Sequence, residues 1–90
     1  MAVVRAGVAW FTEEQWPEYG RMMSDFSGES YASWRQHLDR LEKRLTQKGV
    51  TVIRVPIDLS EFDFWCAVNR RPRDSEARSD YAAAQMDKPR

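Results

Sequence analysis

The chain has 90 residues, and its 14 lysine and arginine side chains balance 14 aspartate and glutamate side chains, so the formal net charge is zero. This length fits one small domain, residues 1–90. A content of 42% hydrophobic and 12% aromatic residues excludes an intrinsically disordered chain. One cysteine and one histidine exclude an intrachain disulfide and a zinc site of four His/Cys ligands. Zero net charge removes the global signature of a nucleic-acid binder.

The N-terminal segment, residues 1–11, is apolar but interrupted by Arg5. It is shorter than the roughly 20 apolar residues that a transmembrane helix needs. It also lacks the order of charge, apolar run and cleavage site that defines a secretory signal. The unpaired Cys66 agrees with a reducing compartment. We therefore expect a cytoplasmic, non-membrane protein.

The first part of the chain predicts a strand followed by a helix. Residues 3–11 alternate between two faces, which is typical of a strand. Thr12 and Gln15 form a capping-box pattern, which predicts a helix from there to about Met23. A loop at residues 24–29 follows.

The next segment is the most regular of the chain. Ser30 is the expected N-cap of a helix of about 18 residues, and Gly49 is its expected C-terminal cap. The apolar positions recur every three or four residues: Tyr31, Trp34, Leu38, Leu41 and Leu45.

The second half predicts a strand and two further helices. Residues 50–55 form an apolar strand closed by Pro56. Asp58 caps a short helix, which the basic loop at residues 70–73 ends. A last helix starts at Asp74 or Ser75, and residues 87–90 are expected to fray.

The predicted fold class is therefore α+β, in the order β-α-α-β-α-α, with a two-stranded antiparallel sheet packed on helices. One sheet face is expected to join Val8 and Trp10 to Ile53 and Val55 against the helices. The opposite face, which includes Arg54, is too apolar to be fully exposed to solvent. Either the C-terminal helix or a second subunit covers it, and we predict a homodimer through the sheet or its edge.

Several short motifs together resemble a family of small uncharacterised bacterial proteins. The motifs are Ala9-Trp10-Phe11, Trp16-Pro17, Tyr31-x-x-Trp34, Val55-Pro56-Ile57-Asp58, Trp65-Cys66 and Ala77-Arg78. The resemblance covers most of the chain. It implies a bacterial, single-domain accessory protein, and it implies no catalytic or binding residues.

Catalytic chemistry has few candidate side chains in this sequence. Cys66 and His37 are the only possible nucleophile and base of that type, but Cys66 falls on a predicted inward stripe, where free cysteine is usually buried. The acidic cluster of Asp58, Glu61 and Asp63 is better explained by helix capping than by acid–base or metal chemistry. We therefore expect no catalytic residue, no cofactor and no metal.

Partner contact is the better-supported class of function. Phe26 lies in a polar loop and Phe64 points away from its helix's apolar stripe, as interface anchors do. Arg40 and Arg44 lie on an exposed helix side. We therefore predict a non-enzymatic accessory or regulatory protein that acts through protein–protein contact as a homodimer, with these four residues at the contact.

The distribution of charge leaves an alternative open. Acidic residues exceed basic ones in residues 1–30 (five against two) and 49–69 (three against one), whereas basic residues exceed acidic ones in 31–48 (five against two) and 70–90 (six against four). The alternative is a nucleic-acid-associated regulator that uses the basic helix 35–48 and the 70–73 loop. Its candidate phosphate contacts are Arg40, Arg44, Lys48, Arg70, Arg71 and Arg73.

Overall fold

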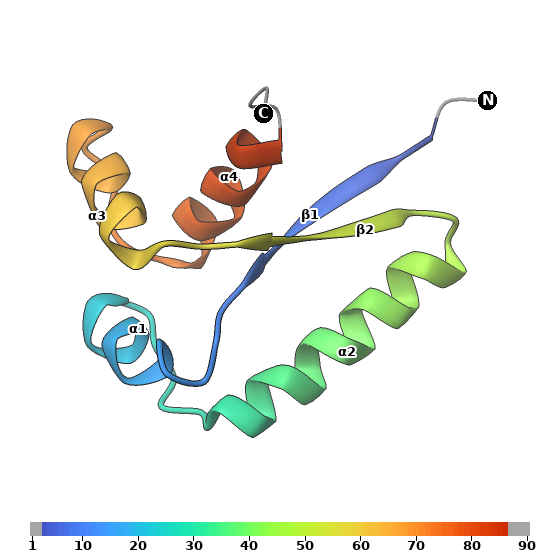
Figure 1. Cartoon of the computed structure of the whole chain (residues 1–90), viewed down its shortest axis with the longest axis horizontal. Helices are drawn as coiled ribbons and strands as arrows, with labels where there is room; N and C mark the ends of the chain where they lie inside the picture. Colours follow the sequence, from blue (N-terminus) through green and yellow to red (C-terminus); the bar gives the residue numbers. More distant parts are fainter. Residues whose placement is uncertain (1–2, 87–90) are drawn as a thin grey trace.

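The computed structural model describes residues 3–86, and its elements follow the predicted order (Figure 1). They are β1 (Arg5–Trp10), α1 (Trp16–Met22), α2 (Tyr31–Gln47), β2 (Thr51–Pro56), α3 (Leu59–Val68) and α4 (Ser75–Met86). The fraying predicted for residues 87–90 lies outside the described residues.

The two strands pair in parallel, so the predicted antiparallel arrangement is wrong. That prediction assumed that both intervening helices run the length of the strands. However, α1 has only 7 residues and is about 10 Å long, whereas α2 has 17 residues and is about 25 Å long. The short α1 only changes the direction of the chain at the end of β1. α2 alone runs back along the strands, so β2 starts beside the start of β1 and runs in the same direction (Figure 1).

The helices that pack on the strand pair are α2 and α4, whereas α1 and α3 lie beyond the carboxyl ends of β1 and β2 (Figure 1). The register pairs Gly7 with Ile53 and Val8 with Arg54. Side chains in register share a face of a parallel pair, so the predicted grouping of Val8 with Ile53, away from Arg54, is wrong. A Cβ at Gly7 would lie 3.4 Å from the Ala82 carbonyl oxygen, so α4 packs on the Gly7 face. The C-terminal helix thus supplies the second cover that a parallel sheet needs.

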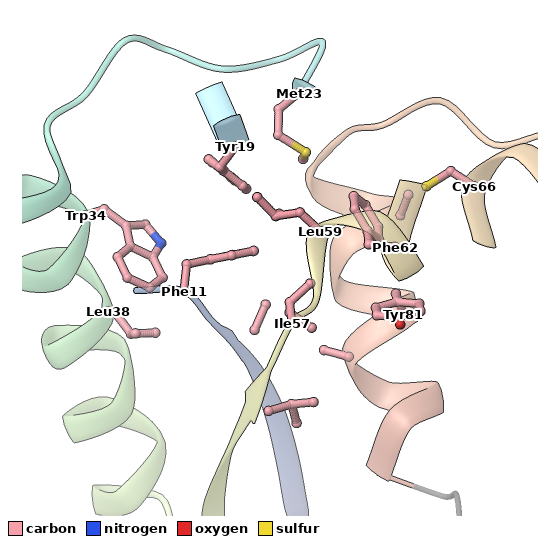
Figure 2. Close-up of a cluster of buried hydrophobic side chains, with 14 residues drawn as sticks. Phe11, Tyr19, Met23, Trp34, Leu38, Ile57, Leu59, Phe62, Cys66 and Tyr81 are labelled. Atoms are coloured by element: carbon pink, nitrogen blue, oxygen red, sulfur yellow. The ribbon is translucent and has the colours of Figure 1, made fainter. Parts of the chain in front are cut away.

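The core gathers where the strands end, and five of its fourteen buried residues are aromatic (Figure 2). Phe11, just after β1, is fully buried between Tyr19 and Trp34, with ring centroids 4.5 and 5.7 Å away. On the other side, Phe62 of α3 packs against Tyr81 of α4, with centroids 5.4 Å apart. Ring contacts thus hold α1 and α2 to the residue after β1, and hold α3 to α4.

The predicted apolar stripe of α2 is only partly buried. Trp34 and Leu38 are buried, but Leu41 is 37% exposed. The second half of α2 therefore extends beyond the core and leaves an apolar side chain at the surface.

Local hydrogen bonds set the helix ends. The Ser30 hydroxyl accepts the Ser33 N–H at 3.1 Å, which confirms it as the N-cap of α2. The Asp58 carboxylate likewise accepts the Glu61 N–H at 3.0 Å at the start of α3. Gly49 has φ +81°, the left-handed backbone conformation in which glycine commonly ends a helix.

The predicted capping box at Thr12 and Gln15 forms as a pair of reciprocal bonds, but regular helix begins only at Trp16. The Gln15 side-chain amide also donates to the Ile57 carbonyl oxygen at 2.8 Å. The turn before α1 therefore ties the end of β1 to the end of β2.

Candidate interaction sites

The outer side of α3 carries an apolar patch, which we call the α3 patch and define as the exposed Phe64 and Val68, the half-buried Trp65 and the buried Tyr81 beneath them. Phe64 is 70% exposed and Val68 is 62% exposed. These two residues are four apart and therefore share one helix face. Trp65 and Tyr81 form the floor of a shallow hollow of about 480 Å³ beside them. Phe64 lies where the helical phase of the sequence predicted it.

The two ends of α3 carry opposite charge. Asp58 and Glu61 are exposed in its first turn, and the loop beginning with Arg70 and Arg71 follows its last turn. Arg70 is exposed and has φ +53°, in the left-handed region. The α3 patch is thus flanked by acidic side chains on one side and by arginines on the other.

Phe26, the other predicted anchor, is half-buried and packs against the core cluster. Its ring lies edge-on to Trp16 and Tyr19, with centroids 5.7 and 5.9 Å away. A Cβ at Gly20 would lie 2.9 Å from the Phe26 ring, so the absence of a side chain there makes room for it. The Phe26 ring is therefore occupied within the fold.

The arginines predicted for partner or phosphate contact lie in two separate places. Arg40, Arg44 and Lys48 are exposed on the second half of α2. The loop of Arg70, Arg71 and Arg73 connects α3 to α4 on the other side of the strands (Figure 1).

Two of the loop arginines also have acidic partners. Arg71 lies 2.9 Å from the Asp80 carboxylate and 5.6 Å from the Trp65 ring centre. Arg73 pairs with Asp63 at 2.5 Å. These two guanidinium groups serve the packing of α3 against α4.

A partly enclosed groove lies between α2 and α4, and the sequence did not indicate it. It has a volume of about 340 Å³ and runs past Gly7, Val8 and Ala9 of β1. Its other walls come from α2, from α4 and from the 25–29 loop: Trp34, His37, Leu38 and Leu41; Ser75, Arg78 and Ser79; Asp25, Phe26, Ser27 and Glu29. Because segments far apart in the sequence build this groove, no local sequence pattern could have predicted it.

Two carboxylates stand at the loop end of this groove. Glu29 accepts a hydrogen bond from His37 Nδ1 at 3.0 Å, if that nitrogen carries the proton. Asp25 accepts the Ser75 N–H at 2.9 Å, and this bond holds the pKa of Asp25 below its usual value. Arg78 binds the Tyr19 hydroxyl, while burial of that phenol raises the Tyr19 pKa.

The only cysteine and the only histidine do not form a catalytic pair. Cys66 is fully buried in α3, and desolvation raises the pKa of its thiol. His37 lies on α2, across the strands, with Glu29 as its partner. A nucleophile and its base must lie within hydrogen-bond reach. Within residues 3–86, no group of three or more His, Cys, Asp or Glu side chains is placed to hold a metal ion.

Across the described residues, none of the helices has the length and apolar character needed to cross a membrane. Comparison of the chain with protein-family profiles, curated proteins and solved structures finds no match.

Proposed function

We propose that this chain is a small non-enzymatic protein that acts through protein–protein contact, and that a second copy of the chain binds at the α3 patch. The observation that carries the proposal is the exposure of Phe64 and Val68 on one helix face between ends of opposite charge. Exposed aromatic side chains in such a setting are typical interface anchors.

A two-fold arrangement makes the α3 patch self-complementary. In a homodimer with two-fold symmetry, the same patch serves both copies, and two α3 helices crossing the axis run antiparallel. If the axis passes near Trp65, Phe64 and Val68 of both copies form the centre of the contact. When the axis crosses α3 at the level between Trp65 and Cys66, Glu61 of each copy faces Arg70 of the other, because both positions are then equally far from the axis along the chain. The antiparallel helix dipoles also attract.

The size of the patch limits the strength of the dimer. A stable interface of standard size buries about 800 Å² per partner. α3 has 10 residues and is about 15 Å long, so it needs the adjoining surface of α4 to approach that area. We therefore expect a dissociation constant on the order of micromolar rather than nanomolar.

The nucleic-acid alternative receives less support from the geometry. The exposed row of Arg40, Arg44 and Lys48 remains available for phosphate, but Arg71 and Arg73 are paired with aspartates. A contact limited to about three cations gives weak, strongly salt-dependent binding. Titration with DNA or RNA at low and physiological salt distinguishes this alternative from self-association.

The direct test is the molar mass of Phe64→Ser by light scattering coupled to size exclusion, across the micromolar range. We expect the wild-type mass to rise toward that of a dimer with concentration. Loss of a central aromatic anchor should weaken the dimer by about 30-fold or more.

Val3→Ser is the matched control, because Val3 is 72% exposed on the opposite end of the sheet. It should associate like the wild type. A wild-type mass that stays monomeric at high micromolar concentration contradicts the proposal, and so does equal weakening by both variants.

A further inference from the structure

The strand β1 has one free edge, and its hydrogen-bonding groups there face the groove. The Val4 carbonyl accepts the Thr51 N–H at 2.9 Å, and the Trp10 carbonyl accepts the Ile57 N–H at 3.1 Å. Residues along a strand alternate in the direction of their backbone groups, so the even-numbered residues of β1 face β2. The backbone N–H and C=O groups of Gly7 and Ala9 therefore point the other way, into the groove they line.

The two free edges of the sheet differ in how they are protected. By the same alternation, Arg54 and Pro56 present their backbones on the free edge of β2. A charged residue and a proline without an N–H are common means of preventing edge pairing. The groove section of β1 consists of Gly7, Val8 and Ala9, which provide neither. Arg5, whose backbone lies on the same free edge of β1, precedes this section. The part of the sheet edge that is suited to accept another strand is therefore the groove section of β1.

The walls of the groove favour a particular pattern of side chains. Leu38 and Leu41 of α2 form an apolar wall, whereas Ser75 and Ser79 of α4 form a polar one. Side chains of an added strand alternate between two faces. The side chains on one face of the added strand would therefore contact Leu38 and Leu41, and those on the other face would contact Ser75 and Ser79.

The charge of the groove favours a cationic ligand. Asp25 and Glu29 stand against the single cation Arg78, whose guanidinium already binds the Tyr19 hydroxyl. Two carboxylates and one guanidinium line this part of the groove, so its formal charge is negative. A lysine, an arginine or a free amino terminus complements it.

We propose that this groove binds an extended peptide segment as an added strand on β1. The backbone of the segment pairs with Gly7 and Ala9, its alternate apolar and small polar side chains face α2 and α4, and a cationic group lies near Asp25 and Glu29. Three residues of a strand span about 10 Å, so the groove holds the central part of a longer segment. Strand addition of this kind draws affinity from backbone bonds and specificity from alternate side chains.

A second copy of the chain fits this groove poorly. Its own β1 carries α2 and α4 on its two faces, and these helices would meet the same two helices of the first copy. A single extended segment has no such layers. The inference is thus independent of the dimer proposed at the α3 patch.

The test uses a synthetic seven-residue peptide that alternates leucine and serine and carries a lysine at each end. Binding is measured by titration calorimetry, and amide hydrogen exchange of the protein is followed by NMR. At a free peptide concentration ten times the dissociation constant, we expect exchange at Gly7 and Ala9 to slow by about tenfold.

A peptide with the same side chains but N-methylated at alternate residues is the matched ligand control, since it lacks the backbone donors. It should bind at least tenfold more weakly. Leu41→Asp should weaken binding of the first peptide by about tenfold, because it replaces the apolar wall with a charge. Gln36→Asp, at an exposed position of α2 outside the groove, should have no effect.

Three results overturn the inference. They are absence of binding by the alternating peptide, equal binding by the N-methylated peptide, and unchanged exchange at Gly7 and Ala9 in the bound state. Self-association that Leu41→Asp abolishes and Phe64→Ser leaves intact would instead identify the groove as a contact between copies. The dimer proposal is judged separately, because Phe64→Ser should leave peptide binding unchanged.

Discussion

The ion pair between Arg54 of β2 and Glu42 of α2 provides a quantitative test of how the long helix is held to the sheet. The guanidinium makes two hydrogen bonds of 2.8 Å to the two carboxylate oxygens and lies 3.9 Å from Asp39. Its central carbon is 4.3 Å from the centre of the Trp10 ring. Arg54→Met keeps most of the apolar stem of the side chain while removing the charge.

The size of the effect follows from geometry and exposure. The Arg54 side chain is 47% exposed and that of Glu42 is 15% exposed, so solvent screens the pair only in part. A bidentate pair of this kind belongs at the upper end of the surface range, about 1 kcal/mol. The contact with Trp10 adds about 0.5–1 kcal/mol. Arg54→Met should therefore lower the free energy of unfolding by about 1.5–2 kcal/mol.

A double-mutant cycle with Glu42→Gln, measured by urea unfolding at pH 7, isolates the pair. We expect Glu42→Gln to cost about 1 kcal/mol and the coupling between the two sites to be about 1 kcal/mol. A coupling below about 0.3 kcal/mol, which is the range of independent sites, would refute the reasoning.

The same pair has a defined pH dependence. The hydrogen bonds from Arg54 hold the pKa of Glu42 below its usual value of 4.5. A lowered carboxyl pKa stabilises the folded state above the unfolded-state pKa, and this stability is lost as the pH falls through the folded-state pKa. Wild-type stability should therefore fall from about pH 5 downward. Arg54→Met should show a shallower decline over that range.

Three further predictions concern folding. Phe26→Ala should lower the free energy of unfolding in urea by about 2–3 kcal/mol, because the Phe26 ring packs against the core cluster. Phe64→Ala should change it by less than about 0.5 kcal/mol, because Phe64 is exposed. Equal effects of the two variants would show that Phe26 does not support the core. Ser30→Ala should cost about 1 kcal/mol by thermal melting through loss of the α2 cap, and an unchanged melting temperature would contradict that role. Cys66→Ser should cost about 1–3 kcal/mol, since it buries a hydroxyl among apolar groups, and the wild-type thiol should react with a disulfide reagent only on unfolding; fast reaction of the native protein would contradict its burial.

The features that the sequence predicted correctly are encoded over a few residues. The caps at Ser30 and Asp58 depend on a hydrogen bond to an N–H three residues later. The exposure of Phe64 follows from its phase on α3 relative to the buried Phe62 and Cys66. Local hydrogen bonds and helical phase need no knowledge of the rest of the fold.

The features that the sequence did not predict depend on how distant elements meet. Strand direction required the relative lengths of α1 and α2, and the pattern did not show that α1 would be so short. The environment of Phe26 depends on the space above Gly20, in a neighbouring element. The groove beside β1 is assembled by α2, α4 and the 25–29 loop, so it exists only in the folded chain.

The central claim, self-association through the α3 patch, is tested most directly by exchanging the charges at the two ends of that patch. Sedimentation velocity is measured for Glu61→Arg, for Arg70→Glu and for the double variant. We predict that each single variant weakens the dimer by placing like charges opposite each other, and that the double variant restores it, because each swapped side chain again faces its opposite in the second copy. A double variant as weakly associated as the single variants, or three variants that all behave like the wild type, would contradict the account.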